Sequence, residues 1–174
     1  MPLISKTAYL QKARFQDANI DFDAKVKPII AEVEQRDIKT QLGEVFYNKL
    51  RTYLANPTPV NAALDLLMSG GDYTYEANNY NFAGLESAIA YYTSAELLDS
   101  QAGVLAVTGY RAANDTYSSM ADLKDRRNNY DKIRGIAESY MKDCLVYLNR
   151  FATATGFEAC QTKKRKNKFY VIES

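Results

Sequence analysis

The sequence predicts a mainly helical fold, a bundle of about five to six helices with a small aromatic β-hairpin and an extended C-terminal arm. Apolar residues recur at three- and four-residue steps through most of the chain. This period changes to two around Tyr73, and a basic run followed by β-prone residues closes the chain. Because 47% of the 174 residues are apolar, the chain can bury a core. We expect one helical domain over 1–156 and an arm over 157–174.

Caps and prolines divide the first part of the chain into four expected helices. Ser5 is a candidate N-cap, the acidic pair at Asp21 and Asp23 offers a second, and Gly43 has the character of a helix-ending glycine. The expected helices cover 6–15, 25–42, 44–54 and 58–68. The third should bury an apolar face that includes Val45.

The next segment predicts a hairpin. Ser69–Gly71 breaks the helical pattern, and aromatic residues then alternate with polar ones on both sides of an expected turn at Asn78–Asn79. These aromatic side chains could cover an end of the helical core or contact a neighbouring subunit. They are Tyr73, Tyr75, Tyr80 and Phe82.

Two further helices are expected beyond the hairpin. One covers 85–99, and the longest runs from a cap at Ser118 or Ser119 to about residue 154, before Gly156. Between them, 103–116 should be irregular with a short extended piece over 104–107. Cys144 falls in the apolar stripe of the long helix and should be a small core residue.

Composition argues against catalysis. The chain has no histidine, so neither a Ser-His-Asp nor a Cys-His set can be built, and neither a dinucleotide nor a P-loop glycine motif occurs. The carboxylate pairs Glu32/Glu34 and Asp21/Asp23 are interpreted as solvated charge or helix caps, although a site built from Asp and Glu alone stays open. Cys144 and Cys160 do not form a metal-ligand pattern. We expect no enzyme activity, no cofactor and no metal.

The sequence also bears on the compartment. No secretory leader follows Met1, and no stretch approaches the roughly 20 apolar residues that span a bilayer. We expect the protein to be kept in the cytosol, or packaged into something assembled there, without membrane contact.

The last residues differ in charge from the rest. Residues 161–174 carry a net charge of +4, and residues 1–160 carry −3. The tail could be solvated, could contact nucleic acid through its charge, or could dock on a partner through its apolar end. We favour docking, because four consecutive apolar, β-prone residues are a hazard when left free. The docking residues would be Lys163, Lys164, Arg165, Lys166, Lys168, Phe169, Tyr170, Val171 and Ile172.

Three blocks of sequence carry a family resemblance. They are Ala31–Glu32 through Leu42–Gly43 into Phe46–Leu50, then Leu66–Tyr73 followed by Phe82–Tyr92, and lastly the tyrosine-rich helix ending in Cys144–Leu148. In this order they resemble the head–tail connector proteins (adaptor or ring proteins) of tailed bacteriophages, especially crAss-like phages and others of Bacteroides-type hosts.

The resemblance implies a structural virion protein at the neck. Such connectors assemble in the host cytoplasm as a ring, commonly a dodecamer, beneath the portal protein. The ring extends the DNA channel without sequence-specific contact and offers a platform for downstream tail or second ring proteins. The arm 157–174 would order on the portal or on the next subunit. Basic residues of the long helix could face the channel or pair with a neighbour's acids: Lys124, Arg126, Arg127, Lys132 and Arg134.

Two other functions stay open. The basic tail could make the protein a nucleic-acid-binding accessory factor, or the helical body could be a small chaperone that binds one partner helix.

Overall fold

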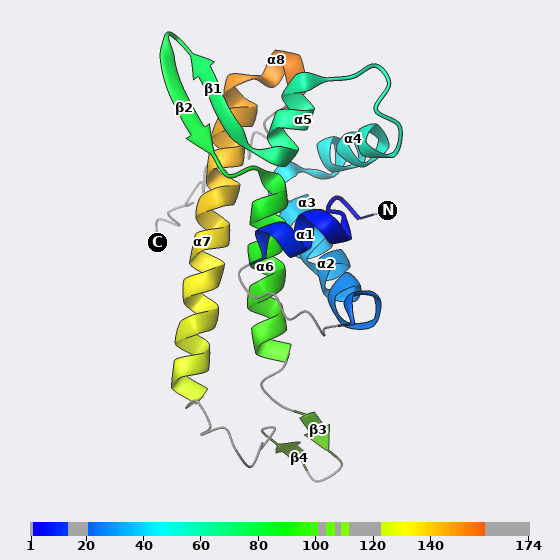
Figure 1. Ribbon diagram of the computed structural model, residues 1–174, viewed down its shortest axis with the longest axis vertical. Coiled ribbons are helices and arrows are strands. Elements are labelled where there is room, and N and C mark those ends of the chain that lie inside the picture. Colours follow the sequence, from blue (N-terminus) through cyan, green and yellow to red (C-terminus); the bar gives the residue numbers. More distant parts are fainter. Residues whose placement is uncertain (1, 14–20, 101–103, 107–108, 112–122, 159–174) are drawn as a thin grey trace, which may run out of the picture.

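The computed structural model describes residues 2–13, 21–100, 104–106, 109–111 and 123–158. The predicted fold class is confirmed for these residues, which form a mainly helical body with an aromatic hairpin (Figure 1). The segment 159–174, expected to form most of the arm, lies outside them, as does the expected cap at Ser118 or Ser119.

Helices α1 to α4 form the first part of the fold. Helix α1 (Lys6–Lys12) is capped by Ser5, whose side chain accepts a hydrogen bond from the Ala8 amide, as predicted. A continuous helical rod then combines a π-helical turn η1 (Phe22–Val26), α2 (Lys27–Val33), a second π-helical turn η2 (Glu34–Ile38) and α3 (Lys39–Leu42). Asp21 caps this rod. Gly43, at φ +79°, ends it and starts α4 (Glu44–Ala55).

Helix α5 (Ala62–Ser69) begins later than the sequence indicated. Its N-cap is Asn61, whose side-chain oxygen accepts from the Ala63 and Leu64 amides. The expected start at Thr58 or Pro59 is therefore wrong. The Asn61 side chain satisfies two of the amides that a helix start leaves without partners, which Thr58 does not do.

The hairpin pairs β1 (Gly71–Tyr75) with β2 (Asn78–Phe82), and Tyr73 lies opposite Tyr80. Its turn falls at Glu76 and Ala77, which adopt positive φ angles of 48° and 63°. The turn predicted at Asn78–Asn79 is wrong, because Asn78 already pairs with Tyr75. This register places the aromatic side chains of the two strands on one face.

Two long helices form the axis of the molecule. Helix α6 (Leu85–Ser100) and helix α7 (Leu123–Arg150) pack along each other, and β3 (Val104–Ala106) and β4 (Gly109–Arg111) lie at their far end (Figure 1). The long helix was expected to run to about residue 154, but α7 ends at Arg150. A separate short helix, α8 (Ala152–Thr155), follows it, and this helix ends at the expected glycine, Gly156.

Helix α6 is buried on nearly all sides, since α1, α2, α5 and α7 all contact it. Its apolar residues Leu85, Ile89 and Tyr92 are fully buried, and Cys144 of α7 is a core residue as predicted. Two hydroxyl residues of α6 are buried as well, and they bond back to the helix itself. The hydroxyl groups of Thr93 and Ser94 donate hydrogen bonds to the carbonyl oxygens of Ile89 and Ala90, and each bond is 2.8 Å long.

Residue Phe157 belongs to this body, although it was assigned to the arm. It is buried, and its ring meets the ring of Phe46 edge-on at 5.0 Å between centroids. Across the described parts of the chain, no helix combines the length and the apolar character that a membrane crossing requires.

Candidate functional site

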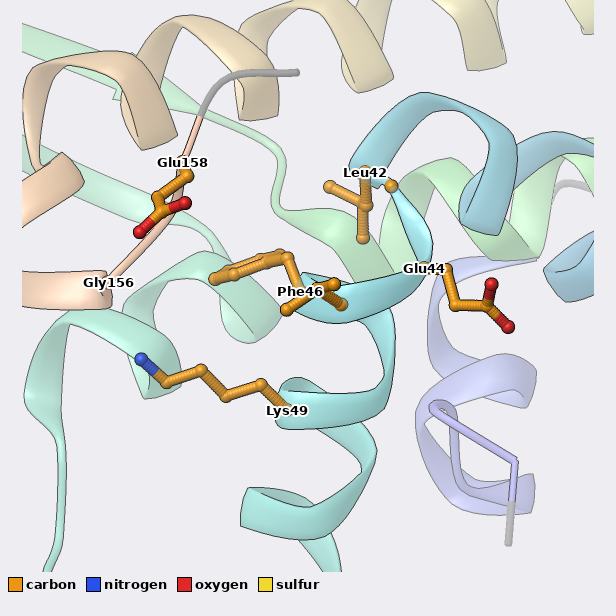
Figure 2. A pocket seen from close by; sticks show the side chains of 8 residues that line it. Leu42, Glu44, Phe46, Lys49, Gly156 and Glu158 are labelled. Carbon is orange, nitrogen blue, oxygen red and sulfur yellow. The ribbon is translucent and has the colours of Figure 1, made fainter.

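A groove opens where the rod α2–α3 turns into α4, beside the residues that follow α8 (Figure 2). We call it the corner groove. Its volume is about 460 Å³, within the range of about 300–1,000 Å³ that ligand pockets occupy. It is lined by Leu42, Gly43, Glu44, Val45, Phe46, Lys49, Gly156 and Glu158.

Two glycines shape the corner groove. Gly43 takes φ +79°, a conformation that L side chains rarely adopt, and so lets the chain reverse between two helices. On the opposite wall, Gly156 ends α8 in the left-handed conformation, at φ +66°. The Phe157 amide then donates to the Ala152 carbonyl, which turns Phe157 inward against Phe46. The chain therefore leaves the described body at the wall of the groove.

The interior of the corner groove is apolar. Leu42 and Phe46 are buried, whereas Val45 is 85% exposed, so the expectation that Val45 lies on the buried face of its helix is wrong. The reason is geometric, because consecutive helical residues point about 100° apart and the neighbouring Phe46 takes the core position.

Charged side chains stand around this apolar interior. In Figure 2, Glu44 and Glu158 lie on opposite sides of Phe46, and Lys49 extends toward Gly156. Lys39 holds the Glu44 carboxylate at 2.8 Å, and this ion pair lowers the pKa of Glu44. The arrangement places charges of both signs around an apolar interior, which suits a partner segment that has an apolar end.

The aromatic hairpin packs on its own chain. Tyr73 meets Tyr147 edge-on at 5.1 Å, and Phe82 stacks on Tyr147 at 4.8 Å. Phe151 contacts both Tyr73 and Tyr75, at 5.6 and 6.0 Å. The four aromatic residues singled out from the sequence thus cover an end of the helical core, which is one of the two roles considered for them.

Arg150, at the end of α7, contacts the aromatic residues of the hairpin. Its guanidinium lies 3.8 Å from the ring centre of Tyr80 and donates a hydrogen bond of 2.7 Å to the Tyr73 hydroxyl. The sequence analysis did not identify this residue. A basic residue at the end of a tyrosine-rich helix, preceded in the chain by alternating tyrosines, was the available signal.

A second cluster joins the rod to the two long helices. Arg134 of α7 binds the Asp37 carboxylate at 2.6 Å and the Glu96 carboxylate at 3.2 Å. Arg36 binds the same two carboxylates, and Tyr130 donates to Glu96 at 2.9 Å. Arg134 was expected to face a channel or a neighbouring subunit, but the structure pairs it within its own chain.

The other predicted basic residues are placed only in part. Arg127 and Lys132 are exposed on α7. Lys124 and Arg126 lie within that helix, but their side chains are outside the described part of the structure. All nine predicted docking residues of the tail, 163–166 and 168–172, also lie outside the described residues.

Glu34 corrects a further expectation. It is only 3% exposed rather than solvated. Its carboxylate accepts hydrogen bonds from the Leu3 amide and, at 3.1 Å, from the Tyr47 hydroxyl. Burial raises the pKa of Glu34, although both hydrogen bonds oppose this shift. The residue fastens the N-terminal segment to the rod and α4.

Within the described residues, no group of three or more acidic or cysteine side chains is arranged to hold a metal ion. The polar clusters just described join elements of the fold, and the corner groove offers apolar surface for binding.

Comparison with known protein families gives one match. The model of a family of unknown function, DUF6712, matches residues 38–167. This range includes most of the chain, so the protein belongs to that family. No curated protein and no solved structure matches the chain.

Proposed function

We propose that the protein is a structural head–tail connector of a tailed bacteriophage. Copies of the chain would form a ring between the portal and the tail, and DNA would pass through it. The observation that carries this proposal is the ordered set of sequence blocks that resembles connector proteins. The ring would act through protein contacts alone.

The fold supports the proposal because the second and third sequence blocks contact each other around the hairpin. The second block contains Gly70, Gly71 and Gly84, which join α5, the hairpin and α6. The third block contributes Tyr147, against which the hairpin packs. The blocks therefore define one architectural unit, as a structural protein requires.

The shape of the subunit is a second support. The molecule is elongated along α6 and α7, with α4, α8 and the hairpin toward one end (Figure 1). The corner groove lies between the start of α4 and the residues that follow α8. A closed ring needs two different patches on each subunit, which meet head to tail. Two exposed apolar residues, Val45 in the first turn of α4 and Val60 in the loop before α5, are 85% and 77% exposed and offer part of such a patch.

The basic tail supports a second candidate function, binding of nucleic acid. Five basic residues between 163 and 168 would neutralise phosphates, and the affinity would fall steeply with salt. Neutralising these residues would then abolish DNA binding. A connector would bind its protein partners without requiring DNA.

Quantitative peptide mass spectrometry of purified phage particles from the source of the gene tests the proposal. We expect the protein in the particles at a fixed, low copy number comparable to that of the portal. Absence from particles, combined with abundance in infected cells, would contradict the connector function. Native mass spectrometry with the purified portal adds a second test, since a one-to-one complex without a ring would instead favour a small chaperone.

A further inference from the structure

We propose that the C-terminal segment Phe169–Ile172 occupies the corner groove of its own chain. The described residues supply the groove, and the sequence supplies the segment, whose own placement lies outside them. The inference does not rest on the connector function, because it concerns a contact within one subunit.

The corner groove has apolar surface that needs a cover. Val45, two residues after Gly43, is 85% exposed, and it adjoins the apolar side chains of Leu42 and Phe46. The described part of the chain exposes three large hydrophobic residues, and Val45 is the most exposed of them. Burying this surface would gain roughly 25 cal/mol for each Å² removed from water.

The tail starts at the groove itself. Phe157 packs on Phe46, and Glu158 is already a lining residue. Phe169 lies eleven residues after Glu158, a length of chain that spans up to about 36–40 Å when extended. As a flexible chain it averages about 17–20 Å between its ends, so the segment can return to the groove.

This short link favours the chain's own groove over a second copy. A short flexible linker sets an effective concentration of the order of millimolar, far above the concentration at which the protein would be studied. Docking of the segment on its own chain is therefore favoured over docking on a second copy, provided that the linker can reach the groove.

The charges of the groove and the tail are complementary at Glu158. Glu44, on the other side of the apolar interior, is already paired with Lys39, and Lys49 also lines the groove. Residues 161–174 carry a net charge of +4 just before and around the apolar segment. In an extended segment, alternate side chains point to the same side. Either Phe169 and Val171 or Tyr170 and Ile172 would enter the groove together, while the preceding lysines meet Glu158, since Glu44 is already paired with Lys39.

Disulfide trapping in the full chain tests the proposal. All variants also carry Cys160→Ser. Cys144 should not react, because it is buried and its thiol pKa is raised to about 12. Val45→Cys is combined with Val171→Cys or, separately, with Ile172→Cys, since adjacent residues point to opposite sides. A cysteine is a small apolar residue and keeps the groove apolar.

The matched control moves the groove cysteine to Lys142, an exposed position on α7. It lies fourteen residues before Gly156, about 21 Å along the helix, so the tail can reach both sites. Under mild oxidation we expect one of the two groove pairs to form a disulfide within the monomer at least tenfold faster than its Lys142→Cys counterpart. Intact mass and non-reducing electrophoresis measure the products.

Two outcomes would overturn the proposal. Equal rates of disulfide formation at the groove and at Lys142→Cys would mean that the tail does not bind in the groove. Mainly disulfide-linked dimers would assign the groove to the tail of a second copy.

A second measurement avoids cysteines. In the double variant Phe169→Asp and Val171→Asp, hydrogen exchange of the Glu44–Lys49 segment should become several-fold faster than in the unmodified chain, because the cover is lost. The control is Thr162→Asp, which adds charge before the apolar segment. The counterpart variant Tyr170→Asp and Ile172→Asp changes the other side of the segment, and unchanged exchange in both double variants would also reject the proposal. A protein that is absent from phage particles could still pass both tests, so the two proposals fail independently.

Discussion

Gly70, at the junction of α5 and β1, and Gly84, at the junction of β2 and α6, lie against each other. A Cβ atom on Gly84 would come within 2.3 Å of the Gly70 nitrogen, and one on Gly70 within 2.6 Å of the Gly84 nitrogen. Both residues also have positive φ angles, +77° and +82°. Gly70 was interpreted from the sequence as a helix stop, and the structure adds that it must also admit the backbone of Gly84.

We predict that Gly84→Ala lowers the free energy of unfolding by about 2–5 kcal/mol, the combined effect of the left-handed backbone and of overpacking. Urea denaturation measures the change. The control is Gly135→Ala in the interior of α7, where a Cβ meets nothing within 4 Å. That variant should gain about 0.5–1 kcal/mol, since alanine suits a helix better than glycine. A stable Gly84→Ala protein would show that the two backbones can move apart.

Arg134 supports the second prediction. Its two carboxylate partners are largely buried, with Asp37 at 8% and Glu96 at 16% exposed side-chain surface, whereas Arg134 itself is 26% exposed. Arg134→Met removes the charge and keeps the length, so it leaves Asp37 with less compensation. We expect a loss of about 1–3 kcal/mol of unfolding free energy.

Two further variants define the origin of that loss. Lys132→Met, an exposed substitution on the same helix, should stay within about 0.5 kcal/mol of the unmodified protein. Adding Asp37→Asn to Arg134→Met should cost less than the sum of the two single changes, since each removes the same ion pair. Strictly additive losses would mean that the ion pair between Arg134 and Asp37 contributes nothing to stability.

Arg150 makes the hairpin dependent on α7. Besides its place over Tyr80, it lies 5.3 Å from the ring centre of Tyr75. We expect Arg150→Ala to cost about 1–2 kcal/mol and to speed hydrogen exchange of the β1 and β2 amides more than that of α6. Arg150→Lys should be intermediate, because an ammonium group keeps the charge but not the planar stack. Lys142→Ala, on the exposed side of α7, is the control, and equal exchange in all variants would contradict the role.

Local sequence signals were sufficient where one residue decides the structure. Ser5, Asp21 and Gly43 cap or end helices as predicted, and the period-two tyrosines form the hairpin. Cys144 is in the core because the three- and four-residue spacing of its helix is regular.

The sequence was insufficient where tertiary contacts override these signals. Glu34 and Asp37 look solvated in a charged stretch, but the first is buried by Leu3 and Tyr47 and the second by Arg36 and Arg134. Partners 31 or 97 residues away cannot be read from local spacing. The corner groove depends in the same way on contact between Phe46 and Phe157.

Glu34 gives the last prediction, a dependence of stability on pH. Burial raises the pKa of this carboxyl in the folded protein above 4.5, its ordinary value. Above the folded pKa, Glu34 is ionised in both states, and burying the charge costs stability. As the pH falls through the folded pKa, the native state binds the proton first, so stability rises until the pH is below 4.5 and the unfolded chain is protonated as well.

The variant Glu34→Gln removes this titration and retains an amide that can bond to Leu3 and Tyr47. The difference in unfolding free energy between the unmodified protein and Glu34→Gln should therefore shift in favour of the unmodified protein as the pH falls from 7 toward 4.5. Parallel urea denaturation at several pH values measures it. Glu32→Gln is the control, because Glu32 is exposed two residues away and its substitution leaves the buried site intact. A difference that moves in the opposite direction would mean that the hydrogen bonds from Leu3 and Tyr47 outweigh burial, and that the carboxylate is the form the fold prefers.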